Sequence, residues 1–323
     1  MHLLIDTDLL LADPSRHGLY GPTQSALLAI LQSWQTADAA PPASSVAPDW
    51  LDLNPPVEQQ WAQASGLAAP DGLLPWAARV ARGEGPISPA LSGPGSGLGL
   101  LTPVHWQVGA DRVTLIGPEA LDLDESDRAE LHEVLSASLQ PAGWTLHRGR
   151  EHWFVGADEL TTLPTASLGR VIGRAIDPWL PNQPEARKLR RLQLEVQMAL
   201  HEHPMNQRRE ARRQMPVNSF WLSGTGTLPE PTQIEPEGLA IAAPGLSGPD
   251  LPELLNNLLD AAAQHHPARL TLCGTAHTLT LTPPAPPSWL SRQIGQLKGW
   301  RSRPDPAAQR QMQQRWLERL SQL

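Results

Sequence analysis

The sequence predicts a mixed α/β to α+β protein, because strand-like and helix-like segments alternate along much of its 323 residues. Residues 100–117 alternate apolar and polar side chains around a turn, which is typical of a β-hairpin. Residues 124–140 and 183–202 repeat apolar side chains every three or four positions, which is typical of amphipathic helices. Short apolar runs near the two ends of the chain, LLID and LAIAA, indicate buried strands.

The first 99 residues combine short elements with connections rich in proline and glycine. A helix opened by proline is expected over 22–37. Residues 38–58 are rich in Pro, Ala and Ser, and we expect them to form an exposed connector. Short helices are expected at 57–67 and 76–82. Residues 83–99 hold so much Gly, Pro and Ser that they predict a flexible linker at a domain boundary.

Residues 100–230 are expected to form a domain of their own. The helix after the first hairpin is predicted to begin at Asp124, whose side chain suits an N-cap. A second hairpin is expected over 143–156. The helix over 183–202 is predicted to be capped by Asn182 and to bury one apolar face. The residues of that face are Leu189, Leu192, Val196, Ala199 and Leu200.

Residues 231–287 are expected to return to the domain that residues 1–99 begin. They contain the strand LAIAA, a helix over 249–264 and a hairpin over 268–283. We expect these closing elements to complete one sheet with the N-terminal strand LLID, so that this core domain is not contiguous in sequence. Residues 288–323 are expected to form a basic helical tail.

Charge is unevenly distributed along the chain. The formal net charge of −8 argues against a general nucleic-acid coat protein. Residues 181–217 nevertheless carry eight Lys and Arg against four Glu, and residues 288–323 carry seven against two acidic residues. Such basic segments indicate an anionic ligand, a protein partner or self-association, unless they are solvated helix faces. Trp and Arg alternate in the tail, which suits either nucleic acid or a tail helix docked on the body.

The sequence indicates a cytoplasmic protein without membrane association. Its first residues include three Asp and no basic segment before the short apolar run, unlike a secretory signal. No run reaches the ~20 apolar residues that a membrane-spanning helix needs. The single cysteine, Cys273, cannot form an intramolecular disulfide, and we expect a small buried side chain there.

Residues 201–226 hold the most specific pattern in the chain. Pro204 cannot continue a helix, so the preceding helix is expected to end near His203. An Arg-rich connector is expected next, followed by a strand that ends at Gly224 and Gly226, where a backbone or ligand can approach closely. Guanidinium groups suit carboxylate or phosphate partners. The expected ligand-binding residues are His203, Asn206, Arg208, Arg209, Arg212 and Asn218.

The runs HPMNQRR and NSFWLSGTG resemble the HP-[VI]-N-x-x-R and N-x-x-x-x-x-G-x-G element of the archaeal-type cofactor-independent phosphoglycerate mutases, which belong to the alkaline phosphatase superfamily. The resemblance covers residues 100–230 and implies a mutase-like insertion domain there. It also implies a reduced alkaline-phosphatase-like sheet from residues 1–99 and 231–287. The whole chain more closely resembles a proteobacterial family of regulatory or uncharacterised proteins, regulation-of-pathogenicity-factors type E. That second resemblance implies no established chemistry.

The sequence departs from the mutase family at the metal site. A two-metal site needs several carboxylates and histidines that converge. The family's DG-x-G-D, D-x-x-G-H and D-H patterns have no counterpart here, and the first strand ends LLIDTD without a following glycine. Asp6 and Asp8 are either relics of the first ligand or part of a capped strand end. His147 and His152 are a candidate metal pair, with surface histidines as the alternative. We therefore expect no metal, no cofactor and no catalytic residue.

Three hypotheses about function follow from these patterns. The first is a non-catalytic regulatory or scaffold protein that binds an anionic ligand or a protein partner through its basic segments. The alternative, favoured by residues 201–226, is a phosphoglycerate mutase or a phosphatase-type enzyme. The second alternative is nucleic-acid binding through the tail. For the arginines of 201–226, the alternative to ligand binding is bonding to helix carbonyls and nearby acidic residues.

Overall fold

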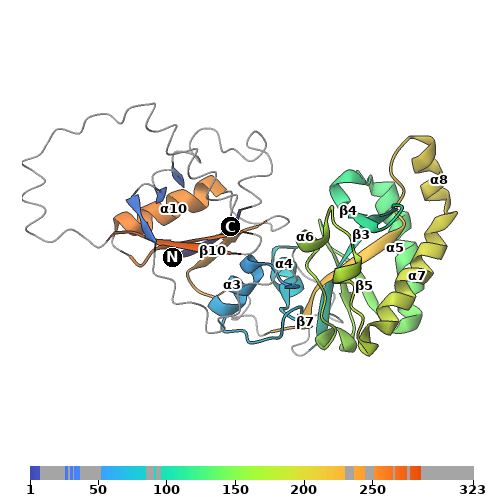
Figure 1. Ribbon diagram of the computed structural model, residues 1–323, viewed down its shortest axis with the longest axis horizontal. Helices are drawn as coiled ribbons and strands as arrows, with labels where there is room; N and C mark the ends of the chain where they lie inside the picture. The colour runs from blue at the N-terminus through green and yellow to red at the C-terminus, as the bar shows by residue number, and fades with distance from the viewer. Residues whose placement is uncertain are drawn as a thin grey trace, which may run out of the picture. The chain divides into compact units, whose positions relative to one another are not determined.

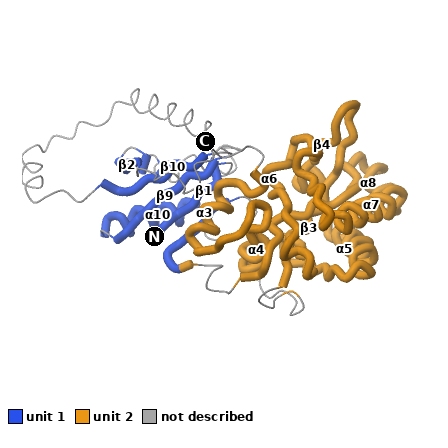
Figure 2. Tube along the Cα trace, turned by 60° about the horizontal axis from the view of Figure 1, so that its bottom comes forward, with its two compact units in different colours: residues 1–50, 237–323 blue, residues 51–236 orange. Residues whose placement is uncertain are grey.

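The computed structural model describes part of the chain, and this part forms two compact units. The described residues are 1–7, 26–27, 30–31, 33–36, 52–84, 91, 96–229, 236–243, 251–264, 266–274 and 277–284. Unit 1 comprises residues 1–50 and 237–323, and unit 2 comprises residues 51–236 (Figures 1 and 2). Each unit contains a sheet and helices, which confirms the mixed α/β class. The assignment of 1–99 and 231–287 to a phosphatase-like core, of 100–230 to a mutase-like insertion and of 288–323 to a tail stays a prediction.

Unit 1 is built on a five-stranded sheet in the order β2-β10-β9-β1-β8. Strand β1 (His2–Asp6) lies between β8 (Leu239–Ala242) and β9 (Arg269–Cys273) and runs parallel to both. Strand β10 (Thr278–Thr282) pairs antiparallel with β9 and with β2 (Gln35–Thr36). The expectation that the closing elements complete one sheet with the N-terminal strand is therefore confirmed.

Helix α10 (Leu251–Ala263) connects β8 to β9 and packs on this sheet. Such a crossover is what two parallel strands require. The apolar side chains that α10 buries against the sheet, and the sheet residues that meet them, are Leu254, Leu255, Leu258, Leu3, Ile5, Leu270 and Leu272. The helix expected over 22–37 ends before residue 35. The described residues from 26 to 33 are helical, but Gln35–Thr36 forms a strand that pairs with β10.

Cys273 ends β9 as a buried free thiol, as the sequence predicts. Burial, and then the neighbouring charge of Asp6, raise the pKa of this thiol above its ordinary range. A thiol that resists ionisation is a poor nucleophile and a poor metal ligand. Cys273 is therefore a core residue.

Unit 2 contains the second sheet, in the order β4-β3-β6-β5 with β7 paired to β3. Both expected hairpins are confirmed: β3 (Gly97–Val108) pairs with β4 (Val113–Ile116), and β5 (Thr145–Arg148) pairs with β6 (Trp153–Gly156). Strand β7 (Ser219–Thr227) runs antiparallel along β3. Strand β3 begins at Gly97, so the last three residues of the segment 83–99, expected to be a linker, belong to this strand. Gly97 and Gly99 take part in its pairing with β6 and β7.

Two long helices, α5 (Glu125–Leu139) and α7 (Arg187–His201), form a core with this sheet. Asp124 caps α5 by accepting a backbone N–H at 2.8 Å, as predicted. Helix α7 begins later than expected, since residues 184–186 form a 3₁₀ turn and no side chain caps it, so the prediction for Asn182 is wrong. No described helix is long and apolar enough to cross a membrane.

The core under α5 and α7 is formed by leucines, valines and aromatic side chains from helices and strands. Its principal members are Leu131, Leu135, Leu139, Leu189, Leu192, Val196, Leu200, Trp153, Val155, Phe220 and Leu222. The prediction is wrong for one residue of the apolar α7 face, because Ala199 is exposed. Gln193 is buried instead and donates from its side chain to the carbonyl of Phe220 at 3.3 Å. That hydrogen bond offsets the cost of burying an amide.

Strand β7 is buried on both of its faces. Between Phe220 and Leu222, the side chain of Trp221 points to the opposite side and joins a second core cluster with Val171 and Trp179. This cluster surrounds the segment that contains α6 (Leu168–Val171). The Trp221 indole N–H donates to a backbone carbonyl at 2.9 Å, so the ring is buried without an unpaired donor.

Residues expected to be an exposed connector, 38–58, are buried at their described end. Helix α3 (Pro56–Ala64) begins inside this segment. Asn54, Val57 and Glu58 are exposed by only 0%, 3% and 4%. The expectation of exposure is wrong here, because Glu58 is hydrogen-bonded inside the protein and its polar character does not force it into water.

The glycines at the end of β7 allow another backbone to approach, as the sequence predicts. Gly224 has a φ of +61° and Gly226 a φ of +155°. A Cβ on Gly226 would stand 2.4 Å from the carbonyl oxygen of Leu73 and 3.1 Å from the nitrogen of Pro75. A Cβ on Gly224 would stand 2.9 Å from the nitrogen of Ala77, in helix α4 (Trp76–Glu84). The two glycines therefore seat β7 against the start of α4.

We expect Gly226→Ala to lower the free energy of unfolding by about 2–4 kcal/mol, because the new Cβ would collide with backbone atoms. Gly66→Ala is the matched control, since Gly66 also has a positive φ, +66°, but nothing lies within 4 Å of its Cβ position. That control should cost about 1 kcal/mol from backbone strain alone. Urea unfolding measures both variants, and equal losses would contradict the close approach.

Candidate functional site

The six expected ligand-binding residues lie where α7 ends, α8 (Pro204–Ala211) follows and β7 begins (Figure 1). The arginines expected in a connector lie on or at the end of this short helix, so that expectation is wrong. Pro204 occupies its first turn, where a missing N–H costs nothing. His203 caps it, because its Nδ1 accepts the N–H of Met205 at 3.2 Å. A second helix thus begins almost directly after the first one ends.

The side chain of Asn206 fastens the end of α7 to the start of β7. Its Nδ2 donates to the carbonyl of Leu200 at 2.8 Å and to the carbonyl of Val217 at 2.7 Å. Its Oδ1 accepts the N–H of Val217 at 2.9 Å. The amide is buried, so these bonds satisfy both of its donors and one side of its acceptor. Asn206 is a structural residue in this arrangement.

Arg209 is the fully buried member of the group, with a side chain exposed by 0%. Its Nε donates to the carbonyl of Met215 at 3.0 Å. Its terminal nitrogens donate to the carboxylate of Asp127 and to the carbonyl of Leu121. Asp127 lies in the first turn of α5 and is itself buried. The guanidinium therefore links α8 to α5 and to the segment before α5, and it does not face solvent.

Arg208 and Arg212 are the exposed members, with side chains exposed by 44% and 58%. Arg208 pairs with Glu130 of α5, and this hydrogen bond raises the pKa of the guanidinium and lowers the pKa of the carboxyl. Arg212 lies 3.8 Å from the carboxylate of Asp124. Exposed ion pairs of this kind are weak and open to competition. An anionic ligand would have to compete with the carboxylates of α5.

Asn218 holds the end of β3 beside the start of β7. Its Oδ1 accepts the N–H of Trp106 at 2.7 Å, and its Nδ2 donates to the carbonyl of Trp106 at 3.0 Å. The side-chain amide thus forms two hydrogen bonds with the backbone of Trp106 that continue the hydrogen-bonding pattern between the two strands.

All six residues have protein partners in this arrangement. The alternative considered for the arginines, bonding to carbonyls and nearby acids, is the arrangement found. Ligand binding by the six stays a prediction, and Arg208 and Arg212 are the exposed members.

We expect Asp127→Ala to lower the free energy of unfolding by about 3–5 kcal/mol, because it leaves the buried guanidinium of Arg209 without its counter-charge. Arg208→Ala, on the helix that carries Arg209, is the control, and it should change stability little because its ion pair is exposed. Denaturation followed by tryptophan fluorescence measures both. An Asp127→Ala variant as stable as the control would contradict the buried ion pair.

A buried polar network joins the start of α3 to the segment before α6, and sequence reasoning missed it. One carboxylate oxygen of Glu58 accepts from Asn54 Nδ2 and from the hydroxyl of Ser167, each at 2.6 Å. Arg170 is buried and donates to the carbonyl of Asn54 at 3.2 Å. Burial lowers the pKa of this guanidinium, against the opposing charges of Asp52 and Glu58. The only signal in the sequence was a few polar residues within a proline-rich stretch, whose composition predicts exposure.

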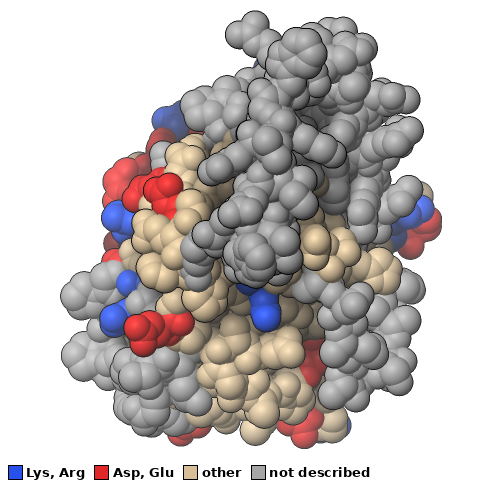
Figure 3. All heavy atoms as spheres, turned by 90° about the vertical axis from the view of Figure 1, so that its left-hand side faces the viewer, with Lys and Arg blue, Asp and Glu red and all other residues tan. Residues whose placement is uncertain are grey.

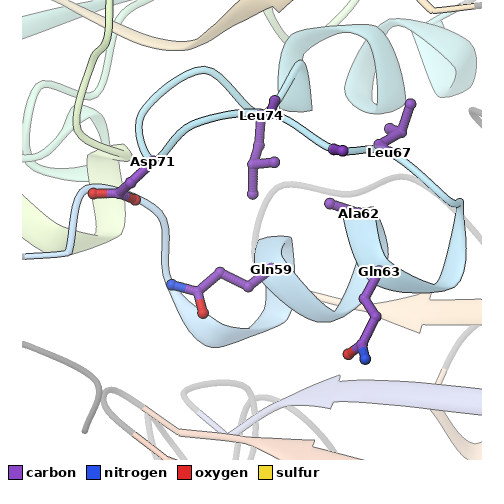
Figure 4. Close-up of a pocket in the computed structure, with 8 residues that line it drawn as sticks. Gln59, Ala62, Gln63, Leu67, Asp71 and Leu74 are labelled. Carbon is purple, nitrogen blue, oxygen red and sulfur yellow. The ribbon is translucent and has the colours of Figure 1, made fainter. Parts of the chain in front are cut away.

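Asp71 fastens the loop after α3 to this network and also lines a pocket. Its carboxylate accepts the N–H groups of Leu53 at 2.7 Å and Asn54 at 2.9 Å. The pocket has a volume of about 340 Å³, and Figure 4 shows Leu74 projecting toward α3, which carries Gln59, Ala62 and Gln63. Its other lining residues are Leu67, Ala68 and Ala69. No lining residue is cationic, so this pocket does not suit an anion.

Glu84, at the end of α4, holds the turn between β5 and β6. Its side chain is exposed by only 3%, and its carboxylate bonds to the N–H of Glu151 at 2.9 Å and to Nδ1 of His152 at 2.6 Å. Among the described residues, Glu84, Glu151 and His152 are the only group of three or more His, Cys, Asp or Glu residues whose possible metal-ligand atoms all lie within 4.8 Å of one another. Of the candidate metal pair His147 and His152, only His152 belongs to this group, because the ring of His147 lies against Phe154. Protein donors already hold Glu84, so we describe the group as a structural clasp.

The Glu84 clasp predicts a dependence of stability on pH. Burial by itself raises the pKa of the Glu84 carboxyl, but hydrogen bonds from His152 and from the N–H groups of Glu151 and Arg150 outweigh it and hold the pKa below its ordinary value of 4.5. A carboxyl with a lowered folded-state pKa stabilises the protein above its unfolded-state pKa, and this stability is lost as the pH falls through the folded-state pKa.

We therefore expect thermal stability below about pH 4.5 to fall more steeply in the wild type than in Glu84→Gln, which has no carboxyl to titrate. Melting temperatures measured from neutral pH into this acid range test the expectation. Parallel curves for the two proteins would show that Glu84 titrates alike in the folded and unfolded states.

Other sequence candidates lie apart from these residues. Asp6 ends β1 in register with Cys273, at the position expected for a relic ligand or a strand end. Asp8 and the tail 288–323 lie outside the described residues. The alternatives stated for them stay predictions.

Comparison with known proteins gives distant structural neighbours. No family model and no curated protein matches the chain. The structure is similar to the cofactor-independent phosphoglycerate mutase from Thermoplasma acidophilum DSM 1728, with 12% identity, coverage of 87% of this chain and 88% of that chain, and a TM-score of 0.36. It is also similar to the PH0037 protein from Pyrococcus horikoshii, with 13% identity, 87% coverage of each chain and a TM-score of 0.37. These values define no family for the chain and carry no argument about its chemistry.

Proposed function

We propose that this chain is a non-catalytic binding or scaffold protein with a regulatory role, built on a segment that resembles part of the cofactor-independent phosphoglycerate mutases. One observation carries the proposal. In the mutase-like segment, Asn206 and Arg209 are bonded to the protein's own backbone and to Asp127. Asn206 has both of its side-chain donors occupied, and every nitrogen of the buried Arg209 guanidinium donates to a group of the protein, so both side chains position helices and do not face a substrate phosphate.

The candidate metal ligands support the same proposal. Phosphoryl transfer by two metals requires several ligands around two ions. The described part of the chain gathers one group of three, and Glu84 of that group is held by His152 and by backbone N–H groups. Such a group is too small for a two-metal site.

Arg208 and Arg212 offer a surface for a partner. Both already contact carboxylates of α5, so carboxylate is the chemistry that this surface accepts. A carboxylate-rich segment of a partner protein, or a small anionic ligand, would exchange with Glu130 and Asp124. Guanidinium groups bind such anions through paired N–H donors.

Nucleic-acid binding has less support in the described part of the chain. On the face drawn in Figure 3, the described Lys and Arg lie among Asp and Glu and do not form a continuous basic stripe. A nucleic-acid surface needs such a stripe or patch. This face therefore gives the nucleic-acid alternative no support.

The proposal predicts no phosphoglycerate mutase or phosphomonoesterase turnover above a protein-free blank, with Mn²⁺ added, and it predicts binding of a glutamate-rich peptide. Arg208→Ala/Arg212→Ala should weaken that binding about thirtyfold, since each of the two charged contacts contributes on the order of 1 kcal/mol. Arg112→Ala is the control, because Arg112 is also an exposed, ion-paired arginine.

Turnover in the wild type that disappears in Arg208→Ala/Arg212→Ala would overturn the non-catalytic proposal and favour the enzyme alternative. Equal peptide binding by the wild type and the double variant would refute the role of these two arginines.

A further inference from the structure

The outer face of α7 carries apolar side chains that the described part of the chain leaves exposed. Leu194 and Met198 are exposed by 55% and 64%, whereas Leu192 and Val196 on the other side of the helix are fully buried. Residues four apart lie next to each other on one helix face. Together they form a small apolar patch, which can serve as the centre of a contact surface where charged residues surround it.

Charged residues extend this face in both directions. Arg187 and Arg191 precede the apolar pair, and Glu202 follows it at the end of the helix; all three are exposed. Spacings of three or four residues place these side chains along one line on the helix. From its N-terminal to its C-terminal end, this line of five side chains is therefore basic, then apolar, then acidic, with Glu195 and His201 on either side of it.

The basic end is not explained by the stability of the helix. A helix N-terminus favours acidic side chains, because the unpaired N–H groups there carry partial positive charge. The first turn of α7 has no acidic residue, and four of its first five residues are basic. Arg191 contacts Glu195 at 3.3 Å, but this pair is exposed and contributes little. Two of these basic residues have partners within the protein, since Lys188 pairs with Glu159 and Arg190 donates to the carbonyl of Pro181. The charges of Arg187 and Arg191 on the outer face therefore fit an external partner better than they fit the helix.

We propose that α7 docks antiparallel on α7 of a second copy of this chain, about a twofold axis that passes between Val196 and Gln197. In this register Arg191 faces Glu202 of the second copy. Leu194 faces Ala199 of the second copy, which lies next to Met198 of that same copy. The twofold axis repeats every contact, so the basic end of each helix meets the acidic end of the other. A parallel arrangement would instead set the basic ends against each other.

The size of the face sets the strength of this dimer. Helix α7 has 15 residues and is therefore about 22 Å long. One helix face buries less than the roughly 800 Å² per partner of a standard interface. We therefore expect a reversible dimer with a dissociation constant in the micromolar range. The inference does not depend on whether the protein is catalytic.

Sedimentation velocity of the full chain, from low to high micromolar concentration, tests the dimer. The wild type should shift from monomer to dimer, and Leu194→Glu/Met198→Glu should remain monomeric over the same range. Val108→Glu is the matched control, because Val108 is an 80% exposed apolar residue on the β3–β4 hairpin. A wild type that stays monomeric, or a Leu194→Glu/Met198→Glu variant that dimerises like the wild type, would overturn the proposal.

A charge exchange tests the antiparallel register. Arg191→Glu alone and Glu202→Arg alone should each weaken the dimer about tenfold, and the two together should restore it to within a few-fold of the wild type. Both substitutions place charges that the helix dipole favours, so the fold of α7 is retained. A double variant no better than the single variants would rule out the contact between Arg191 and Glu202 of the second copy.

Discussion

The buried guanidinium of Arg209 is the constraint on which the arrangement of unit 2 depends. Removing a guanidinium from water is unfavourable unless a counter-charge and hydrogen bonds surround it. Asp127 supplies the charge and two backbone carbonyls supply further acceptors. These partners come from α5, from the segment before α5 and from the chain after α8, so α8 has one position that satisfies them all. Asn206 then fixes the end of α7 to the start of β7.

The guanidinium groups of Arg208, Arg209 and Arg212 can bind either a phosphate or a carboxylate. Burial decides whether each of them is held by the protein's own acidic residues or stays accessible to another anion. Arg209 is enclosed and bonded within the chain, whereas Arg208 and Arg212 meet their acidic partners in water. An enclosed arginine stabilises the fold, and exposed ones remain open to exchange with other anions. The segment with the strongest resemblance to an enzyme thus has its central arginine in a structural role.

Local signals predicted much of the fold. The two hairpins of unit 2, the cap at Asp124 and the helix over 249–264 depend on side chains close in sequence. Two of the errors involve distant partners. Residues of the 38–58 connector are buried because Glu58 bonds to Ser167, and the helix expected to reach residue 37 gives way to a strand paired with β10. For the arginines of the six expected ligand-binding residues, the sequence named bonding to carbonyls and nearby acidic residues as the alternative, but it could not show which carbonyls and acids these are.

The sequence by itself determined the periodicity of the helices and strands, the basic charge near α7 and α8, and the flexible glycines at the end of β7, because each depends on residue type and spacing. Tertiary structure decided which of these side chains are enclosed. Ala199 belongs to the apolar face that periodicity predicts, yet it is exposed, whereas the polar side chain of Gln193 is buried. Their surroundings depend on how α7 lies on β7 and α5, and this orientation is set by contacts between segments far apart in the chain.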